Sequence, residues 1–266
     1  MTSISRTTAR LGRRTRAQRR YQAVLCDLFE TIVTFDRGGL PRVQVPGFSY
    51  VPSTMPALLE ILVERWQPPA IEVLIRTLVE VSNEMQAEKE ADFVERSSRV
   101  RFDRVLERLD APESAREPDF VDRLVDCHMA LLARCTVLPD SHGLALERLA
   151  ANHRLALVSN FDHAPTCLAI LDRLDIARFF EDIVVSDSVG LVKPHPSLFE
   201  APLARMGIAA EDALFVGDTP DADVLGAKQA GMDVAWINGK GRELDPELPE
   251  PDFEIASFAE LPDLLG

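Results

Sequence analysis

Polar side chains recur directly after short apolar runs in this sequence. Asp27 follows the run AVLC, Asp218 follows ALFVG, and Ser159 and Asn160 follow RLALV. A carboxylate can act as a nucleophile or as a metal ligand, while a hydroxyl and an amide can donate hydrogen bonds to a substrate. If the fold brings these residues together, the chain has the groups that a group-transfer site needs.

Two further charged residues, Lys193 and Asp223, lie in turns of the same part of the chain. Pro194 and Pro196 follow Lys193 and restrict where its ammonium can reach. Asp223 follows Asp218 in GDTPDAD, where we expect the first turn of a helix. Several acids near one lysine repel each other unless a cation joins them, and oxygen ligands suit Mg²⁺. The residues therefore indicate a site for a phosphoryl group and a magnesium ion.

The elements that must position these residues alternate regularly beyond residue 140. The expected strands are residues 154–160, 182–187, 213–218 and 233–238, and the expected helices lie near residues 141–151, 163–173, 196–206 and 221–230. This alternation predicts an α/β fold, a Rossmann-like parallel sheet with helices on both faces, in which residues 23–27 form the first strand. Ligands bind beyond the carboxyl ends of such strands. The polar residues above, together with Asp187, should therefore meet at one edge of the sheet.

A second unit is expected inside the first. Residues 53–135 have helical periodicity in several segments and no convincing strand, and stretches rich in glycine and proline flank them. We predict an all-helical cap at residues 37–136, inserted into a core formed by residues 21–36 and 137–266. Residues 1–20 are expected to form a basic, flexible extension.

The charge of the chain argues against nucleic acid as a partner. The formal net charge is −14, yet the first twenty residues hold seven arginines and no acid, so the remainder is more acidic still. An acidic body repels nucleic-acid phosphates. No apolar run is long enough for a secretory signal or a membrane span, and the four cysteines form no C-x-x-C pair. We therefore expect a cytoplasmic monomer or homodimer with no membrane partner.

In order and spacing, the motifs resemble those of the haloacid dehalogenase superfamily, in the branch with a helical C1-type cap inserted after the first strand. The four motifs of that family are similar, in order, to the segments DLFET, LVSN, KPHPSLF and VGDTPDAD. The resemblance extends over about residues 21–265, because PDFEIASFAELPDLL is similar to the closing strand and helix of the family. It implies a hydrolase with the fold described above.

The resemblance also implies a role for each matched residue. The nucleophile would be Asp27, which would become an aspartyl-phosphate. The implied catalytic residues are Asp27, Ser159, Asn160 and Lys193, the implied substrate-binding residues are Thr31, Ser159, Asn160 and Lys193, and the implied Mg²⁺ ligands are Asp27, the backbone carbonyl of Phe29, Asp218 and Asp223. The cap would close over the site and contact the leaving group of a small phosphorylated substrate.

The sequence departs from the phosphatases of this family at residue 29. Those enzymes carry there a second aspartate, which protonates the leaving oxygen, and this chain carries Phe29. Loss of such an acid lowers the rate by about 100- to 10,000-fold for a poor leaving group. A phosphatase of this sequence would need a good leaving group, such as an acyl phosphate or an anhydride, or another acid, such as Glu30 or a cap residue.

Three other functions stay open on these residues. The 2-haloacid dehalogenases of this family also have an aromatic residue at position 29 and use no metal, but Asp218 favours phosphate over halide. A chain without its acid could instead be a scaffold that binds a phosphorylated ligand or a protein. Phosphonate cleavage would need a cap lysine, and Lys89 lies in a charged run that we expect to be solvated, as we expect of the cap arginines Arg96, Arg99, Arg101 and Arg104. We predict a Mg²⁺-dependent phosphatase acting on a small phosphorylated metabolite.

Overall fold

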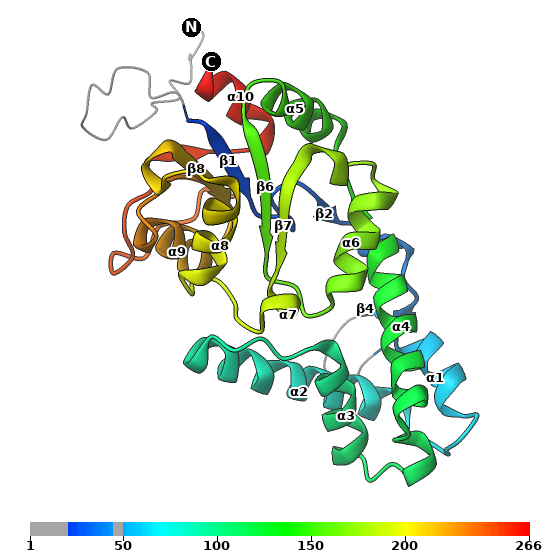
Figure 1. The fold of residues 1–266 in the computed structure, drawn as a ribbon. Coiled ribbons are helices and arrows are strands. Elements are labelled where there is room, and N and C mark those ends of the chain that lie inside the picture. Colours follow the sequence, from blue (N-terminus) through cyan, green and yellow to red (C-terminus); the bar gives the residue numbers. More distant parts are fainter. Residues whose placement is uncertain (1–20, 45–49) are drawn as a thin grey trace, which may run out of the picture.

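A parallel sheet forms the core of the protein, which is described here by a computed structural model of residues 21–44 and 50–266 (Figure 1). The six strands lie in the order β10–β9–β8–β1–β6–β7, and each neighbouring pair is parallel. They are β1 (Ala23–Cys26), β6 (Arg154–Ser159), β7 (Phe180–Val185), β8 (Ala213–Gly217), β9 (Asp233–Ile237) and β10 (Phe253–Ile255). The predicted α/β fold is confirmed. The basic extension predicted at residues 1–20 lies outside the described residues.

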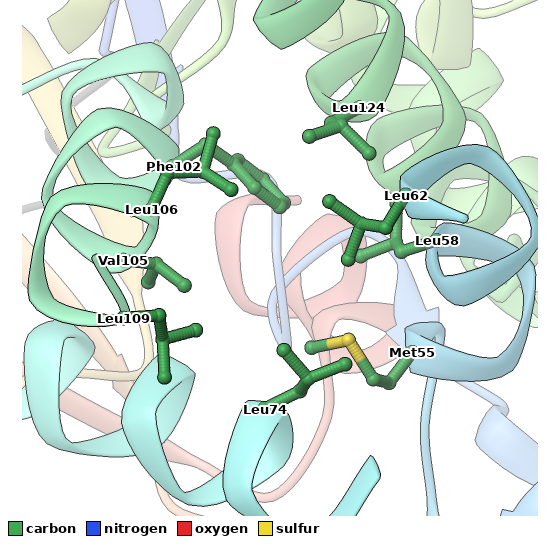
Figure 2. A pocket seen from close by; sticks show the side chains of 9 residues that line it. All are labelled: Met55, Leu58, Leu62, Leu74, Phe102, Val105, Leu106, Leu109 and Leu124. Atoms are coloured by element: carbon green, nitrogen blue, oxygen red, sulfur yellow. The ribbon is translucent and has the colours of Figure 1, made fainter. Parts of the chain in front are cut away.

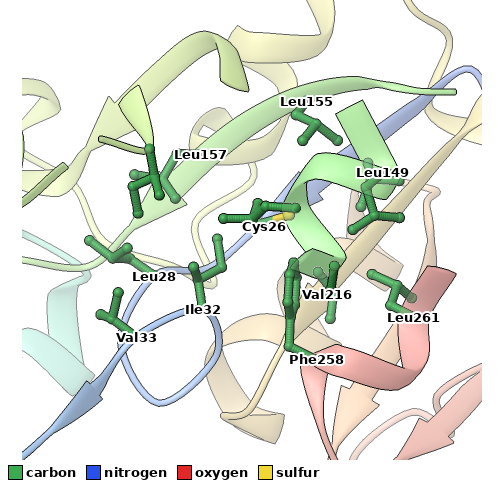
Figure 3. Packing of buried hydrophobic residues seen from close by; sticks show 14 of the residues in the cluster. Cys26, Leu28, Ile32, Val33, Leu149, Leu155, Leu157, Val216, Phe258 and Leu261 are labelled. Carbon is green, nitrogen blue, oxygen red and sulfur yellow. The ribbon is translucent and has the colours of Figure 1, made fainter. Parts of the chain in front are cut away.

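Helices cover both faces of this sheet because its strands are apolar on both sides. The helices of the core are α5 (Asp140–Ala150), α6 (Ala164–Arg173), α7 (Ser186–Val189), α8 (Ser197–Met206), α9 (Leu225–Gln229) and α10 (Leu261–Leu265). One face packs against α5, α6 and α10, where Cys26 and Val216 of the strands lie in one buried cluster with Leu149 and Leu261 (Figure 3). The other face packs against α8 and α9. The sheet is thus covered by helices on both faces.

Two core elements differ from the prediction. The strand expected at residues 182–187 ends at Val185, so Asp187 lies in α7 and not at a strand end. Its Oδ2 accepts a hydrogen bond of 2.8 Å from the backbone N–H of Ala164, and Asp187 therefore holds the start of α6. The helix expected near residues 221–230 begins with a π-helical turn, Pro220–Val224, before α9. Such turns are rare and are frequent at functional sites.

Four helices lie together beside the core (Figure 1). They are α1 (Met55–Leu62), α2 (Ile71–Asp92), α3 (Ser98–Arg108) and α4 (Pro118–Arg134). Their apolar faces meet in a cluster of their own, and Figure 2 shows Met55, Leu74 and Phe102 lining a small pocket there. The space left in this pocket is about 10 Å³. A space of this size barely admits one water molecule, so the helices are closely packed. In the described part of the chain, no helix combines the length and the apolar character needed to cross a membrane.

Paired strands join this helical unit to the core. β2 (Thr34–Phe35) and β5 (Thr136–Val137), one on each side of the helical unit in the sequence, are antiparallel. β3 (Arg42–Val43) and β4 (Val51–Pro52) form another antiparallel pair, within the segment that leads from β2 to α1. The chain therefore leaves the core and returns to it side by side. This geometry agrees with an insertion between β1 and α5, although we keep the exact division at residues 36–37 and 136–137 as a proposal.

A further contact between the two units involves residues 93–98, which we name the docking segment. Val192 N–H donates to the carbonyl of Phe93 at 2.9 Å, and Glu95 N–H donates to the carbonyl of Gly190 at 3.0 Å. Ser98 N–H donates to the carbonyl of Asp162 at 2.8 Å. The helical unit is therefore hydrogen-bonded to the core at the loop that leads into Lys193.

Candidate active site

Asp27 lies directly after β1, the strand between β6 and β8. Its backbone N–H donates to the carbonyl of Val216 at 2.9 Å, and its side chain is buried in the described structure. Because β6 and β8 are parallel to β1, their carboxyl ends carry Ser159 and Asp218 to the same edge of the sheet. The parallel register thus brings to Asp27 two residues that each lie more than a hundred positions from it in the sequence.

Lys193 joins two of the carboxylates at this edge. Its Nζ lies 2.7 Å from Asp27 Oδ1 and 2.8 Å from Asp223 Oδ1, and its side chain is only 2% exposed. Burial acts to lower the pKa of Lys193, but the charges of Asp223 and Asp27 outweigh it and raise that pKa. The lysine is therefore held as an ammonium next to Asp27.

The side chain of Asn160 fixes the backbone of Lys193. Asn160 Oδ1 accepts a hydrogen bond of 2.8 Å from Lys193 N–H, and Asn160 Nδ2 donates one of 3.1 Å to the Lys193 carbonyl. Its amide thus holds the lysine loop with both of its polar ends. Asn160 also lines the cavity described below, where a substrate could reach it. Its contact with substrate stays a prediction.

The π-helical turn brings Asp223 into the same group. Asp223 Oδ2 accepts a hydrogen bond of 3.0 Å from the backbone N–H of Thr219, which closes the turn. Gly217 makes room for it, because a Cβ at residue 217 would collide with the Asp223 carboxylate. Burial raises the pKa of Asp223 to about 6, since it disfavours the charged form.

Three carboxylates, those of Asp27, Asp218 and Asp223, converge at this edge. One oxygen from each lies within 4.8 Å of one oxygen of the others. Burial raises the pKa of Asp27, and burial together with the charge of Asp223 raises that of Asp218. The negative charge is thus incompletely balanced by Lys193. An all-oxygen donor set with excess negative charge fits a hard divalent cation such as Mg²⁺.

Asp218 is held from behind by residues that the sequence did not point out. Trp236 Nε1 donates a hydrogen bond of 3.1 Å to the Asp218 carbonyl, and Arg242 donates one of 2.6 Å to the same oxygen. Arg242 Nη2 also lies 3.8 Å from Asp218 Oδ2. Trp236 is buried, and it positions a candidate metal ligand as well as filling the core.

Two hydroxyl groups, one in the turn after Asp27 and one at the carboxyl end of β6, have no protein partner within the described residues. Thr31 and Ser159 are completely buried, and neither Thr31 Oγ1 nor Ser159 Oγ forms a hydrogen bond there. Leaving a buried hydroxyl unsatisfied costs about 1–3 kcal/mol. Both positions match the predicted phosphate-binding residues, and a bound phosphoryl group would give these donors an acceptor.

Phe29 belongs to an aromatic cluster. Its ring lies 5.1 Å from that of Phe35 in a stacked arrangement and 4.8 Å from that of Phe161. The side chain also lines the cavity next to Asp27, where it offers a ring and no proton. The cluster explains how an aromatic residue is accommodated at this position.

The site opens into a cavity of about 680 Å³ between the core and α2. The core lines it with the residues around Asp27, and α2 and the docking segment contribute Gln86, Lys89, Glu90 and Phe93. The expectation that Lys89 is solvated is wrong. Its side chain is 19% exposed, and its Nζ lies 2.7 Å from Oε1 of Glu95, which is 1% exposed.

The cap arginines are engaged with acids. Arg96 contacts Asp92 and Glu88, and Arg99 contacts Asp103 and Asp122. The remaining two pairs are Arg101 with Asp162 and Arg104 with Glu88. The predicted solvated helix face is therefore a face of ion pairs, and Arg101 ties α3 to the core. None of these arginines lines the cavity within the described residues.

The parallel sheet, the helical insertion and the carboxylates at the strand ends define a hydrolase of one superfamily. The model of the haloacid dehalogenase-like hydrolase family matches residues 21–231. The chain therefore belongs to the haloacid dehalogenase-like hydrolases.

Individual relatives agree with this placement. A glyceraldehyde 3-phosphate phosphatase of Pyrococcus abyssi is 32% identical over 137 residues, which cover 51% of this chain and 56% of the relative, so the match spans about half of that protein. The pyrimidine 5′-nucleotidase YjjG of Escherichia coli is 30% identical over 62% of this chain and 69% of its own length. Among solved structures, a 2-haloacid dehalogenase of Pseudomonas syringae superposes with a TM-score of 0.65 at 25% identity, covering 92% of this chain and 98% of that one.

Proposed function

We propose that this protein is a Mg²⁺-dependent phosphatase that hydrolyses a small phosphorylated metabolite through an aspartyl-phosphate on Asp27. The observation that carries the proposal is the convergence of Asp27, Asp218 and Asp223 with Lys193. The relatives named as a phosphatase and a nucleotidase support a phosphate ester as substrate.

The candidate metal ligands are the carboxylates of Asp27, Asp218 and Asp223 and the backbone carbonyl of Phe29. The three carboxylates have the oxygen chemistry and the excess charge that Mg²⁺ requires. When bound, Mg²⁺ would offset the charge of the phosphoryl oxygens and so favour attack by an anion.

The side chains divide the remaining work. An oxygen of Asp27 forms a bond to phosphorus as the bond from phosphorus to the leaving oxygen breaks, and water then hydrolyses the aspartyl-phosphate. Lys193 favours the ionised form of Asp27 against the effect of burial and offsets the charge of the phosphoryl group, while Asn160 holds the lysine loop. Thr31 and Ser159 donate their unpaired hydroxyls to phosphoryl oxygens.

One observation favours a second function. Phe29 with its aromatic neighbours supplies the apolar wall that suits a 2-haloacid dehalogenase, in which Asp27 would attack carbon and release halide. Asp218 opposes this function because it adds a carboxylate beside the nucleophile. We therefore place phosphate ahead of halide.

The two functions separate in one assay. Release of phosphate from 4-nitrophenyl phosphate and acetyl phosphate, and of chloride from L-2-chloropropionate, is measured with Mg²⁺ and with EDTA. We expect phosphate release that EDTA abolishes and Asp27→Asn eliminates, while Asp126→Asn on the exposed side of α4 leaves it intact. At 100 times its Kd, Mg²⁺ should also stabilise the wild type by about 2.7 kcal/mol and thereby raise its Tm. It should raise the Tm of Asp218→Asn much less. Chloride release in EDTA would establish the dehalogenase instead, and no release of either ion would favour a scaffold.

A further inference from the structure

The cavity must contain a proton donor if esters with poor leaving groups are substrates, because Phe29 cannot supply a proton. Apart from Lys193 and the three converging carboxylates, the titratable side chains that line the cavity within the described residues are Glu30, Lys89, Glu90 and Asp221. The three acids among them are exposed. A carboxylate offers mainly acceptor oxygens, whereas a lysine ammonium carries three N–H donors. Lys89 is therefore the donor that this group offers.

Lys89 is also held in place, as a donor in catalysis must be. Its ammonium lies 2.7 Å from Glu95 Oε1, and the other oxygen of Glu95 accepts a hydrogen bond of 2.5 Å from Ser186 Oγ. Ser186 belongs to α7 of the core and accepts a hydrogen bond from the backbone N–H of Phe161 at 2.8 Å. A buried acid thus links a lysine of the cap to the core at the wall of the cavity. One carboxylate occupies one side of the ammonium, whose three N–H groups point in different directions.

We propose that Lys89 is the general acid of this chain, donating a proton to the leaving oxygen in place of the missing aspartate, and that Glu95 is its positioning residue. The inference rests on the proposed phosphatase activity and on the position of Lys89 in the wall of the same cavity as Asp27 and Phe29. It narrows the substrates to phosphate monoesters of alcohols whose leaving oxygen faces α2, and it removes the need for an acyl phosphate or an anhydride.

The proton balance closes over the two steps. As the bond from Asp27 to phosphorus forms, the leaving oxygen keeps the electron pair of the broken bond and takes a proton from Lys89 Nζ, which becomes a neutral amine. In the second step water attacks phosphorus, its proton returns to Lys89, and the Asp27 carboxylate is regenerated. The products are the alcohol and hydrogen phosphate, and no other reactant is consumed.

The competing explanation is that Lys89 and Glu95 only hold the cap on the core. The two explanations differ in how the rate depends on the leaving group. A general acid matters most when the leaving oxygen is a poor one, whereas a loosened cap affects all substrates alike. The ratio of the kcat values for an alkyl and an aryl ester therefore distinguishes the two.

The test compares ethyl phosphate, phenyl phosphate and 4-nitrophenyl phosphate, which are successively better in their leaving groups, in the full-length protein with Mg²⁺. We expect Lys89→Met to lower the ratio of kcat for ethyl phosphate to kcat for 4-nitrophenyl phosphate by about 100-fold or more. Lys89→Arg keeps the charge and should show a similar loss, because a guanidinium gives up its proton far less readily. Lys240→Met, at an exposed lysine, is the matched control and should keep the wild-type ratio.

Folding is controlled by a second variant. Lys89→Met leaves the Glu95 carboxylate buried without its partner, whereas Lys89→Met combined with Glu95→Gln removes both charges. The double variant should fold and should show the same lowered ratio, with an unchanged affinity for inorganic phosphate by calorimetry. An unchanged ratio in the folded double variant, or an equal loss for all three esters, would overturn the role of Lys89. A wild type without Mg²⁺-dependent release from any ester would instead overturn the proposed phosphatase itself.

Discussion

At the scale of single residues, the site depends on a close approach between the backbone at Gly217 and the Asp223 carboxylate. The glycine ends β8, and the acid follows in the π-helical turn. An added methyl group at Gly217 would displace the acid that contacts Lys193, and Lys193 in turn contacts Asp27. The proposed nucleophile Asp27 is therefore positioned in part through Gly217, which lies behind the Asp223 carboxylate.

We expect Gly217→Ala to lower the free energy of unfolding by about 1–3 kcal/mol through overpacking. Displacement of Asp223 should also lower kcat by on the order of 100-fold, because small misplacements in an active site have effects of this size. The measurements are urea unfolding and phosphate release. Gly39→Ala is the control, since a Cβ at Gly39 meets no atom within 4 Å. Equal behaviour of the two variants would contradict the proposed packing.

At the scale of elements, three helices of the cap meet around a neutral imidazole. His128 of α4 is buried, its Nδ1 lies 2.8 Å from Oγ1 of Thr54 at the start of α1, and its ring lies 5.3 Å from that of Phe102 in α3. Burial, helped by the charge of Arg101, lowers the pKa of His128 from 6.5 to about 4. The junction of these helices therefore requires the unprotonated ring.

This junction predicts an acid-sensitive cap. Above pH 6.5 the ring is neutral in both the folded and the unfolded chain, so its contribution to stability is fully present. As the pH falls towards 4, His128 becomes protonated in the unfolded chain but stays largely neutral in the folded chain. About 3 kcal/mol of unfolding free energy is therefore lost. Urea unfolding at several pH values should show this loss in the wild type and in His195→Gln. His128→Gln should lack that part of the pH dependence, and an identical pH dependence in all three proteins would refute the assignment.

At the scale of the whole molecule, the proposed substrate is an anion, whereas the protein itself is strongly acidic. The chain carries a formal net charge of −14, and Glu30, Glu90 and Asp221 line the cavity that leads to Asp27. Long-range repulsion should slow the approach of a phosphate ester, and salt should relieve it because the Debye length falls from about 30 Å at 0.01 M to about 8 Å at 0.15 M.

We therefore expect kcat/KM to rise with ionic strength over this range, by up to about ten-fold, with kcat changing little. Substituting the three lining acids by their amides should raise kcat/KM at low salt and flatten its salt dependence. A kcat/KM that falls as salt is added would show that local positive charge at Lys193 dominates the approach of the substrate.

The sequence predicted the parts of the molecule that depend on local pattern and order. The strands around Asp27 and Asp218 could be located because each is a short apolar run that ends in a polar residue, and parallel order then placed their ends together. Asp187 was misplaced because the end of β7 depends on where its hydrogen bonds to β6 cease, and apolar pattern does not reveal this.

Contacts that depend on how distant segments pack, such as those between the insertion and the core, could not be predicted from the sequence. Lys89 lies in a run of charged residues, and its burial results from Glu95 and Ser186, whose positions depend on how the cap docks. The same holds for Phe29, whose neighbours Phe35 and Phe161 come from the two sides of the insertion. For residues whose roles depend on tertiary neighbours, the sequence indicated alternative functions but did not distinguish between them.

The docking segment also bears on turnover. Its backbone is bonded to residues 190 and 192, immediately before the lysine that touches the nucleophile. If the insertion moved away from the core to admit a substrate, it would either break these hydrogen bonds or move the loop that carries Lys193 with it. Either event would weaken the contact between Lys193 and Asp27 while the insertion is undocked. Asp27 would then be correctly positioned only after the insertion has docked again. Under the proposed mechanism, the aspartyl-phosphate would then lie beside an ordered Lys193 only while the insertion is docked, and the rate of each cycle would depend on the rate of undocking.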